Sequence, residues 1–321
     1  MTIPANLRTP GFYIEFSNSA AGIISLNTVP ADRCKRYRFN RQLPAKSVPS
    51  VRSAAQKTLH GKDSQLYKMV ASDNTDSVFA AAGDERFDYV ISALNSDAEY
   101  TKLKTVMESR YNSLSANSGI GFIAKKGTYA ELSAWGSTKN SHVVCAVGFN
   151  GSDQSEAEWA AAFGAKVAES LTDDPARPLQ TLPLTGLSVD STGKFTQQER
   201  NNMLYDGISS YKVSLGGDIS IERAITLYQM NAAGSEDASY LDVTTPATLM
   251  YIRRYQINKL SGLYPRHKLA KDGTNFPPGQ PIVTPVHPER TAYRDLRRAD
   301  FSGRNGRHRR IQKVHERVHP G

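Results

Sequence analysis

Residues 119–149, GIGFIAKKGTYAELSAWGSTKNSHVVCAVGF, contain a complete strand–helix–strand unit. The apolar runs GIGFIA and HVVCAVGF have the length and composition of buried strands. Between them, Thr128 is followed three residues later by Glu131, a capping-box pattern that marks the start of a helix. Leu132 and Trp135 follow inside that helix. Two buried strands joined by a helix predict a parallel pair, because a parallel connection needs a crossover of this kind.

The same alternation continues on both sides of this unit. FDYVISAL (87–94) is another apolar strand, and Asp97 is placed to cap the helix after it. The apolar residues of that helix recur at helical spacing and are Tyr100, Leu103, Met107, Tyr111 and Leu114. Ser155 and Glu158 repeat the capping box in front of a further helix, whose apolar residues are Trp159, Phe163 and Val167. This alternation predicts a parallel sheet covered by helices.

Beyond Asp173 the pattern changes and prolines become frequent. Thr196 is placed to cap a short helix, after which KVSL and DISIERAITLY flank Gly216-Gly217, an arrangement that predicts a hairpin. A long helix is predicted over 246–261, with Pro246 in its first turn and Gly262 ending it in a left-handed conformation. We expect this helix to be buried on several sides, because apolar residues cover most of its circumference. They are Leu249, Met250, Tyr251, Ile252, Tyr255, Ile257 and Leu260.

Near the N-terminus, PGFYIEFSN has the period-2 pattern of a strand. Phe12, Ile14 and Phe16 alternate with Tyr13 and Glu15. No hairpin partner lies nearby in the sequence. The backbone groups of this strand must therefore be paired by a distant part of the chain or by another chain.

These patterns predict an α/β fold: a layered core of parallel-type sheet and covering helices, with a smaller α+β C-terminal domain and extended terminal arms. The predicted parts are an N-terminal arm (1–30), a basic irregular segment (31–82), the α/β core (83–175), the C-terminal domain (176–284) and a basic, disordered tail (285–321). Within the irregular segment, SQLYKMVASD (64–73) is predicted as one short helical stretch.

The net charge of +9 over 321 residues is unevenly distributed. Residues 33–62 contain nine Lys or Arg and no acid, and residues 285–321 contain ten Lys or Arg against four acids. Such segments can bind nucleic acid electrostatically, but they are more often simply solvated. Few aromatic residues accompany them and no recognition signature does, so specific nucleic-acid binding is not favoured. Neither a membrane-spanning run nor a signal peptide is present, so membrane insertion and export by that route are not expected.

No catalytic or cofactor pattern stands out. Gly119-Ile120-Gly121 opens a strand, whereas a dinucleotide-binding loop follows one. GLSVDSTGK (186–194) has the wrong glycine spacing for a phosphate loop. The seven histidines have no accompanying ligand constellation, and Cys34 and Cys145 form no metal or redox motif and are predicted to be free thiols. We therefore expect no catalytic residue, no cofactor and no metal.

Four stretches carry a family resemblance: RTPGFYIEF, GDERFDYVISAL, YLDVTTPATLMYIRRY and PRHKLAKDGTNF. Through them the chain resembles contractile phage tail sheath proteins of the Mu-like type, over roughly residues 1–30 and 83–284. The resemblance implies a structural, non-enzymatic subunit that polymerises helically around a tail tube and contracts to drive it through the host envelope. It also implies a location in the virion tail, after assembly in the host cytoplasm.

The partners implied by this resemblance are further copies of the chain, the tail tube protein, and baseplate and tail terminator proteins, without a small-molecule substrate. Terminal arms in this family are thought to add strands to sheets of neighbouring subunits. Phe12, Tyr13, Ile14, Glu15 and Phe16 would then form an inter-subunit arm. The family core is described as similar to subtilisin, but Leu59-His60-Gly61 and Asp190-Ser191-Thr192-Gly193 only echo such motifs. The resemblance implies architecture and not proteolysis.

Two regions depart from the family pattern and coincide with the two basic segments. Residues 31–82 are shorter than in Mu-like sheaths, and the chain after GQPIVTP lacks the strand alternation of a C-terminal arm. Divergence towards a simpler sheath and a disturbed reading frame both explain these departures. The alternative functions are an α/β enzyme of unknown substrate and a basic nucleic-acid-binding protein.

Overall fold

The computed structural model places two compact units, residues 1–247 and residues 248–321. The residues that it describes are 15–16, 23–26, 65–68, 75–82, 86–111, 117–277 and 279–301. The predicted division of the chain at residues 175 and 176 does not coincide with a boundary between these units.

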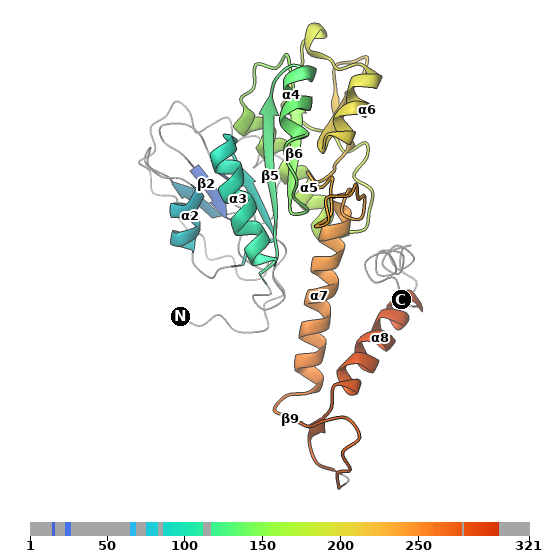
Figure 1. Cartoon of the computed structure of the whole chain (residues 1–321). Helices are drawn as coiled ribbons and strands as arrows, with labels where there is room; N and C mark the ends of the chain where they lie inside the picture. Colours follow the sequence, from blue (N-terminus) through green and yellow to red (C-terminus); the bar gives the residue numbers. More distant parts are fainter. Residues whose placement is uncertain are drawn as a thin grey trace. The chain divides into compact units, whose positions relative to one another are not determined.

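The first unit is built on a six-stranded sheet with the strand order β1-β4-β5-β6-β7-β8 (Figure 1). Its strands are β1 (Glu15–Phe16), β4 (Tyr89–Ser92), β5 (Ile120–Lys126), β6 (Val144–Phe149), β7 (Ile208–Val213) and β8 (Ile219–Arg223). Neighbouring strands from β1 to β7 run parallel, and β8 pairs antiparallel with β7. The predicted α/β class, the parallel sheet and the hairpin across Gly216-Gly217 are confirmed. The sheet also shows why no boundary lies near residue 175, because β7 pairs directly with β6.

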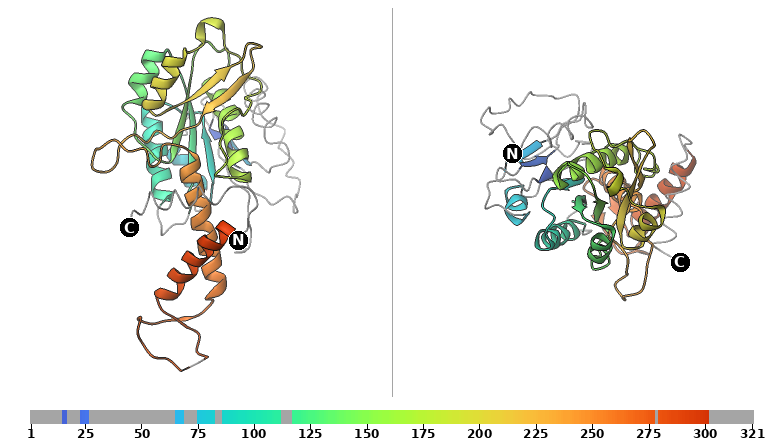
Figure 2. Two further views of the ribbon diagram at one scale, coloured as in Figure 1. Left: turned by 90° about the vertical axis from the view of Figure 1, so that its right-hand side faces the viewer. Right: turned by 90° about the horizontal axis from the view of Figure 1, so that it is seen from above.

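Helices cover both faces of this sheet. Figure 2 shows α3, α4 and α6 on one face and α5 on the other. Their bounds are α3 (Asp97–Arg110), α4 (Tyr129–Gly136), α5 (Glu156–Asp173) and α6 (Gln197–Tyr205). A further helix, α2 (Thr75–Ala82), contacts α3. Burial on both faces is what a parallel sheet requires, because neither face is left to water.

The predicted helix starts are confirmed for three helices, which begin at the capping boxes Thr128–Glu131, Ser155–Glu158 and Thr196–Glu199. The prediction of Asp97 as a cap is wrong: Ser96 caps α3, and its hydroxyl accepts a hydrogen bond from the Glu99 N–H. Asp97 is the first helical residue and instead accepts hydrogen bonds from Trp135 Nε1 at 2.8 Å and Lys139 Nζ at 2.9 Å. It therefore links α3 to the end of α4.

The two faces of the sheet carry different packing. On the α3 side, Val90 and Ile123 belong to one apolar cluster with Leu103 and Met107. On the α5 side, aromatic rings dominate. Phe149 stacks on Trp159 with ring centroids 4.6 Å apart, and Phe122 meets Phe163 edge-on at 6.3 Å. Residues 159–165 of α5 are all buried, so this helix is enclosed around its whole circumference.

Two elements of the segment 31–82 differ from the predictions. SQLYKMVASD was predicted to be helical, but Gln65–Lys68 form strand β3, paired antiparallel with β2 (Ile23–Leu26). A strand partner this far away in sequence leaves no local signal, and a four-residue strand is too short for its periodicity to be distinguished from that of a helix. Helix α2 was not predicted.

The second unit contains most of α7 (Thr244–Leu263), the short parallel pair β9 (Lys268–Leu269) and β10 (Ile282–Val283), and α8 (Val286–Phe301). The long helix was predicted correctly, but its burial was not. In this chain Tyr251, Tyr255 and Ile257 keep 49%, 40% and 41% of their surface exposed.

The turn after this helix also differs from the prediction. Gly262 lies within α7, and its φ is not positive. The residue in the left-handed region is Arg266, with φ 57°. The helix therefore continues through its glycine and the chain turns three residues beyond the end of the helix.

Helix α8 occupies a region predicted to be disordered. Pro288 and Glu289 lie in its first turn, where proline and an acidic residue suit a helix start. Its Thr291 is buried, and the hydroxyls of Thr291 and Tyr264 are 2.9 Å apart. The prediction rested on composition, with many basic residues, histidines, glycines and prolines and little apolar surface, and it did not weigh these helix signals. Residues 302–321 lie outside the described part of the chain.

We predict that Gly119→Ala lowers the free energy of unfolding by about 1–3 kcal/mol, the usual range for overpacking. A Cβ at this position would collide with the backbone oxygen of Phe87 and approach Met107 Cε to 2.9 Å. Urea denaturation measures the effect. Gly216→Ala is the control, since the nearest atoms to its Cβ are 3.6 Å away. Equal stability of the two variants would show that close strand packing does not require Gly119.

Candidate assembly site at the edge of the sheet

The last two of the five predicted arm residues, Glu15 and Phe16, form β1 at one edge of the sheet. Glu15 lies opposite Ile91 and Phe16 lies opposite Ser92, in a parallel pairing of β1 with β4 of the same chain. Phe12, Tyr13 and Ile14 lie outside the described residues. The expected strand is therefore found at its last two residues, where its partner is the chain's own sheet. An inter-subunit role of residues 12–16 stays a prediction.

Strand β1 has neighbours besides β4. The antiparallel pair β2–β3 runs from Ile23 opposite Lys68 to Leu26 opposite Gln65. Strand β2 contacts both β1 and β4, and β3 contacts β1. The edge of the sheet is thus covered by three short strands that come from the first 68 residues.

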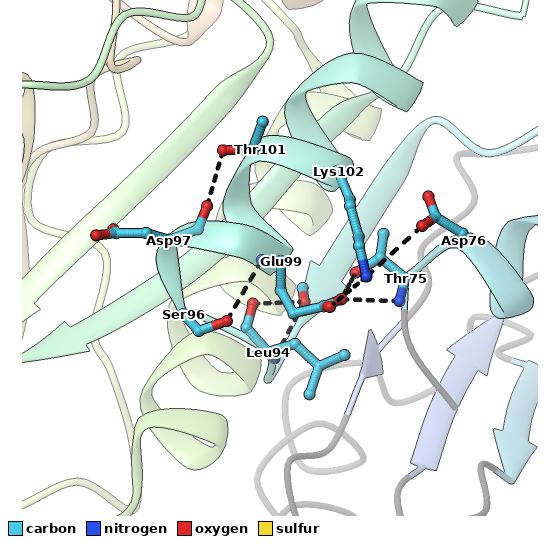
Figure 3. Close-up of polar contacts among 9 residues, drawn as sticks. Thr75, Asp76, Leu94, Ser96, Asp97, Glu99, Thr101 and Lys102 are labelled. Carbon is cyan, nitrogen blue, oxygen red and sulfur yellow. Dashed lines mark hydrogen bonds and ion pairs between the residues drawn. The ribbon is translucent and has the colours of Figure 1, made fainter. Parts of the chain in front are cut away.

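Directly after β4, polar side chains fix the course of the chain (Figure 3). The Ser92 hydroxyl donates to the Leu94 carbonyl and accepts from the Leu94 N–H, both at 3.1 Å. Buried Asn95 donates from Nδ2 to the carbonyl of Ala124 in β5, at 2.8 Å. Ser96 then caps α3. These bonds hold the end of β4 against β5 and set the direction in which α3 leaves the sheet.

Four side chains join the start of α2 to the start of α3, and we call them the Glu99 clasp: Thr75, Asp76, Glu99 and Lys102 (Figure 3). The N–H and the hydroxyl of Thr75 both donate to Glu99 Oε2, at 2.9 and 2.6 Å. Lys102 Nζ donates to Glu99 Oε1 at 2.8 Å and lies 3.6 Å from Asp76 Oδ2. Glu99 therefore satisfies backbone and side-chain donors of a helix other than its own.

The electrostatics of the clasp are consistent with an ionised carboxylate. Partial burial alone would raise the pKa of Glu99, but hydrogen bonds from Lys102 and Thr75 outweigh it and lower the pKa. Apolar contacts add to the attachment of α2, because Val78 and Phe79 are buried in the same cluster as Phe87. The guanidinium carbon of Arg110 lies 4.9 Å from the centre of the Phe87 ring, within cation–π range.

The opposite edge of the sheet is closed in a different way. The segment 181–184 runs antiparallel to β8: the Thr181 N–H donates to the Ile221 carbonyl, and the Leu184 N–H donates to the Ile219 carbonyl, both at 2.8 Å. Between them, Pro183 bridges to Ser220. Proline has no N–H, so it cannot extend the ladder, and edges blocked in this way resist further pairing.

The carboxyl ends of parallel strands are where open α/β sheets bind ligands, often at helix N-termini. Here the chain's own carboxylates lie at two of these helix N-termini. Glu131 accepts the Thr128 N–H and Glu158 accepts the Ser155 N–H, both at 2.8 Å. Lys126 Nζ donates to the Ser152 carbonyl at 3.0 Å. These capping interactions stabilise the helix starts and place a carboxylate of the chain itself where an anionic ligand would otherwise approach.

The hydrolase-like residues have a packing role where the structure describes them. The Asp190 N–H donates to the Gly151 carbonyl at 2.7 Å, and Ser191 starts a 3₁₀ turn of three residues. Gly193 lies so close to the backbone of Gly151 that neither position has room for a Cβ. His60 lies outside the described residues. The segment thus packs on the end of β6, and no Asp–His–Ser arrangement is placed by the structure.

The remaining candidates for chemistry are also structural. His142 packs against the rings of Tyr111 and Tyr240, with centroids 4.8 and 5.2 Å away. Cys145 is a buried free thiol, and its burial raises its pKa to about 12. Within the described ranges, no group of three or more His, Cys, Asp or Glu side chains is arranged to hold a metal ion. No helix in those ranges is both long and apolar enough to cross a bilayer.

Comparison with known proteins points to one family. The family model described as the phage tail sheath protein central domain matches residues 69–227. The Mu-like prophage FluMu tail sheath protein of Haemophilus influenzae is 39% identical over 203 residues. This chain belongs to the phage tail sheath family. The match with the Haemophilus protein covers 63% of this sheath chain and 42% of that relative.

Two solved structures were also found to be similar. A sheath tail protein from Listeria innocua has a TM-score of 0.46 and 12% identity, over 79% of this chain and 58% of the other. A chain of the anti-feeding prophage baseplate, solved by cryo-electron microscopy, has a TM-score of 0.47 and 12% identity, over 83% of this chain and 76% of the other.

Sequence reasoning missed the Glu99 clasp. The only local signal is Thr75-Asp76 in front of an apolar pair, which resembles a helix start. Glu99 could be assigned to the first turn of α3 but not to a second helix, because the contact joins residues 24 positions apart.

A buried carboxyl group, that of Asp88 immediately before β4, predicts a pH dependence of stability. Burial raises the pKa of Asp88 from 3.8 to about 7, although the charge and hydrogen bond of Arg86 oppose the shift. The folded state therefore holds this proton more tightly than the unfolded state does. The tighter binding of this proton stabilises the folded state fully below about pH 4, and this stabilisation is lost as the pH rises to about 7.

We predict that Asp88→Asn removes this loss. As the pH rises from 5 to 8, the free energy of unfolding of the variant should increase relative to that of the unmodified protein, by an amount on the order of 1–2 kcal/mol. Urea unfolding at the two pH values measures the difference. Asp153→Asn, at an exposed position, is the control. An identical pH dependence for all three proteins would show that Asp88 is not the responsible group.

Proposed function

We propose that this protein is a structural subunit of a contractile tail sheath. It polymerises helically around a tail tube and contracts to drive the tube through the host envelope. The observation that carries the proposal is the sheath central domain over residues 69–227, together with a tail sheath relative 39% identical to this chain. The matched region is less than half of that relative, so polymerisation, contraction and partners are part of the proposal.

The layout of the first unit supports a mechanical and not a catalytic role. Carboxylates of the chain's own capping boxes occupy the helix N-termini at the ligand-binding end of the sheet. The aromatic contacts on the α5 side and the enclosed helix give a core that transmits force as one body, because close-packed interiors deform little. Such a body suits a subunit that is displaced during contraction without unfolding.

The partners of this subunit are further copies of itself, the tail tube, and the baseplate and terminator proteins that bound a sheath. Contacts between different faces of identical subunits generate open helical filaments, the symmetry that a sheath needs. The subunit acts in the virion tail and assembles there from the host cytoplasm. Contraction uses no chemical fuel, since a metastable extended lattice relaxes to one that is better packed.

The exposed side of α7 supports assembly as well. Tyr251, Tyr255 and Ile257 present apolar surface in the single chain, and α7 contains no acidic residue. Tyrosine is enriched at the centres of protein interfaces, where it supplies large contact area at low entropic cost. In the proposed sheath, a neighbouring protein covers this surface.

We predict that deleting residues 1–14 abolishes polymerisation and leaves a folded subunit. The deletion removes the upstream part of the proposed arm and keeps Glu15 and Phe16, which pair with β4. Electron microscopy of purified protein at increasing concentration should show tubes or polysheaths for the full chain only, while circular dichroism should give both proteins the same melting temperature within a few degrees.

The control removes the same number of residues from the other end, 308–321. Tubes formed by the protein lacking residues 1–14 would contradict the arm. An absence of tubes from the full chain, under all conditions in which it is folded, would contradict the proposed function itself.

A further inference from the structure

We propose that Glu15 and Phe16 stay paired with β4 of their own chain in the assembled sheath, and that the Glu99 clasp holds this arrangement closed. The proposal rests on the proposed function and divides the expected arm in two. Residues before Glu15 reach the neighbouring subunit, whereas Glu15 and Phe16 anchor the arm to the subunit that supplies it.

The first argument is the register of β1. Glu15 and Phe16 lie opposite Ile91 and Ser92, so they occupy the edge of β4 that an added strand would use. Ile91 and Ser92 are each only 1% exposed. A strand from another subunit could pair with β4 only after β1 had left. That exchange would open a buried edge, and unpaired buried backbone groups are costly.

The second argument is that the chain returns to the same edge. After β1 it forms β2 and β3, which pair with each other and both contact β1. It then enters α2, whose first residue Thr75 is fully buried and bonded to Glu99. Two separate attachments therefore hold the ends of residues 15–82 to the core: the β1–β4 pairing and the clasp.

The third argument is the chemistry of the clasp. One carboxylate receives a backbone N–H, a hydroxyl and an ammonium group, all within 2.9 Å. Hydrogen bonds to a charged partner are roughly twice as strong as neutral ones. Because Thr75 is buried, loss of the carboxylate would leave its donors without this partner, and the start of α2 would open more often.

The direct test is a disulfide between β1 and β4, using Phe16→Cys with Ser92→Cys in a chain that also carries Cys34→Ser. Directly opposite residues of neighbouring strands lie about 4.8 Å apart, within the range for disulfides. Copies labelled with heavy isotopes are mixed with unlabelled copies, assembled into tubes under reducing conditions, and then oxidised. Mass spectrometry of the cross-linked peptides shows whether both halves come from one copy.

We expect cross-links within single copies only, so that the oxidised protein runs as a monomer on a non-reducing gel. Subunits oxidised before assembly should form tubes as well as reduced subunits do. Mixed heavy–light peptides with a ladder of covalent oligomers would overturn the anchor. So would a failure of oxidised subunits to assemble, or the absence of any cross-link. If the unmodified chain forms no tubes, the proposed function fails instead, and the anchor is then judged from the monomer alone.

The clasp is tested separately by hydrogen exchange of the free subunit. Glu99→Gln should speed amide exchange in residues 75–82 about tenfold or more, since one charge-assisted bond is replaced. It should also speed exchange at Glu15 and Phe16. Glu169→Gln is the control, because Glu169 also makes an i,i+3 ion pair at 2.8 Å, with Lys166 in α5, although there the lysine precedes the glutamate. Equal effects of the two variants, or unchanged exchange at Glu15 and Phe16 in Glu99→Gln, would overturn the role of the clasp.

Discussion

The structure depends on how the backbone groups at the two edges of its sheet find partners. A parallel sheet has unpaired N–H and C=O groups along both outer strands, and these groups invite pairing with other chains. At one edge β1 pairs with β4, and at the other the segment around Pro183 covers β8. The chain's own residues thus flank β4 and β8, while helices cover both faces of the sheet, and the central strands are almost completely buried. The helices, the cores on both faces and the clasp all pack on or beside this sheet.

The parts of the fold that were predicted from the sequence are those determined by interactions between residues close together in the chain. Thr128 with Glu131 and Ser155 with Glu158 define helix starts by contacts three residues apart, and the apolar strands beside them need only burial. The alternation of these elements was enough to predict a parallel sheet. The exact cap of α3 was missed because Asn95, Ser96 and Asp97 are all good capping residues and only the backbone of the folded chain distinguishes them.

The parts that were missed depend on contacts between distant residues. The strand at Glu15 and Phe16 was recognised, but its partner Ile91 carries no mark in the sequence, and neither does the bond from Thr75 to Glu99. The exposed side of α7 was predicted to be buried in the core. Apolar periodicity marks a face that is to be covered, but it does not distinguish covering by the same chain from covering by a partner. The sequence therefore predicted which residues form the strand of the candidate site, but not where in the fold that strand lies.

The proline at the β8 edge has a consequence for aggregation. Proteins that assemble through strands risk uncontrolled cross-β growth, in which each added copy offers a fresh edge to the next. Pro183 lacks an N–H on the outer side of the segment that covers β8, so it disfavours the addition of a further strand at this edge. Replacing that proline is the change by which we would expect soluble subunits to become prone to fibrils.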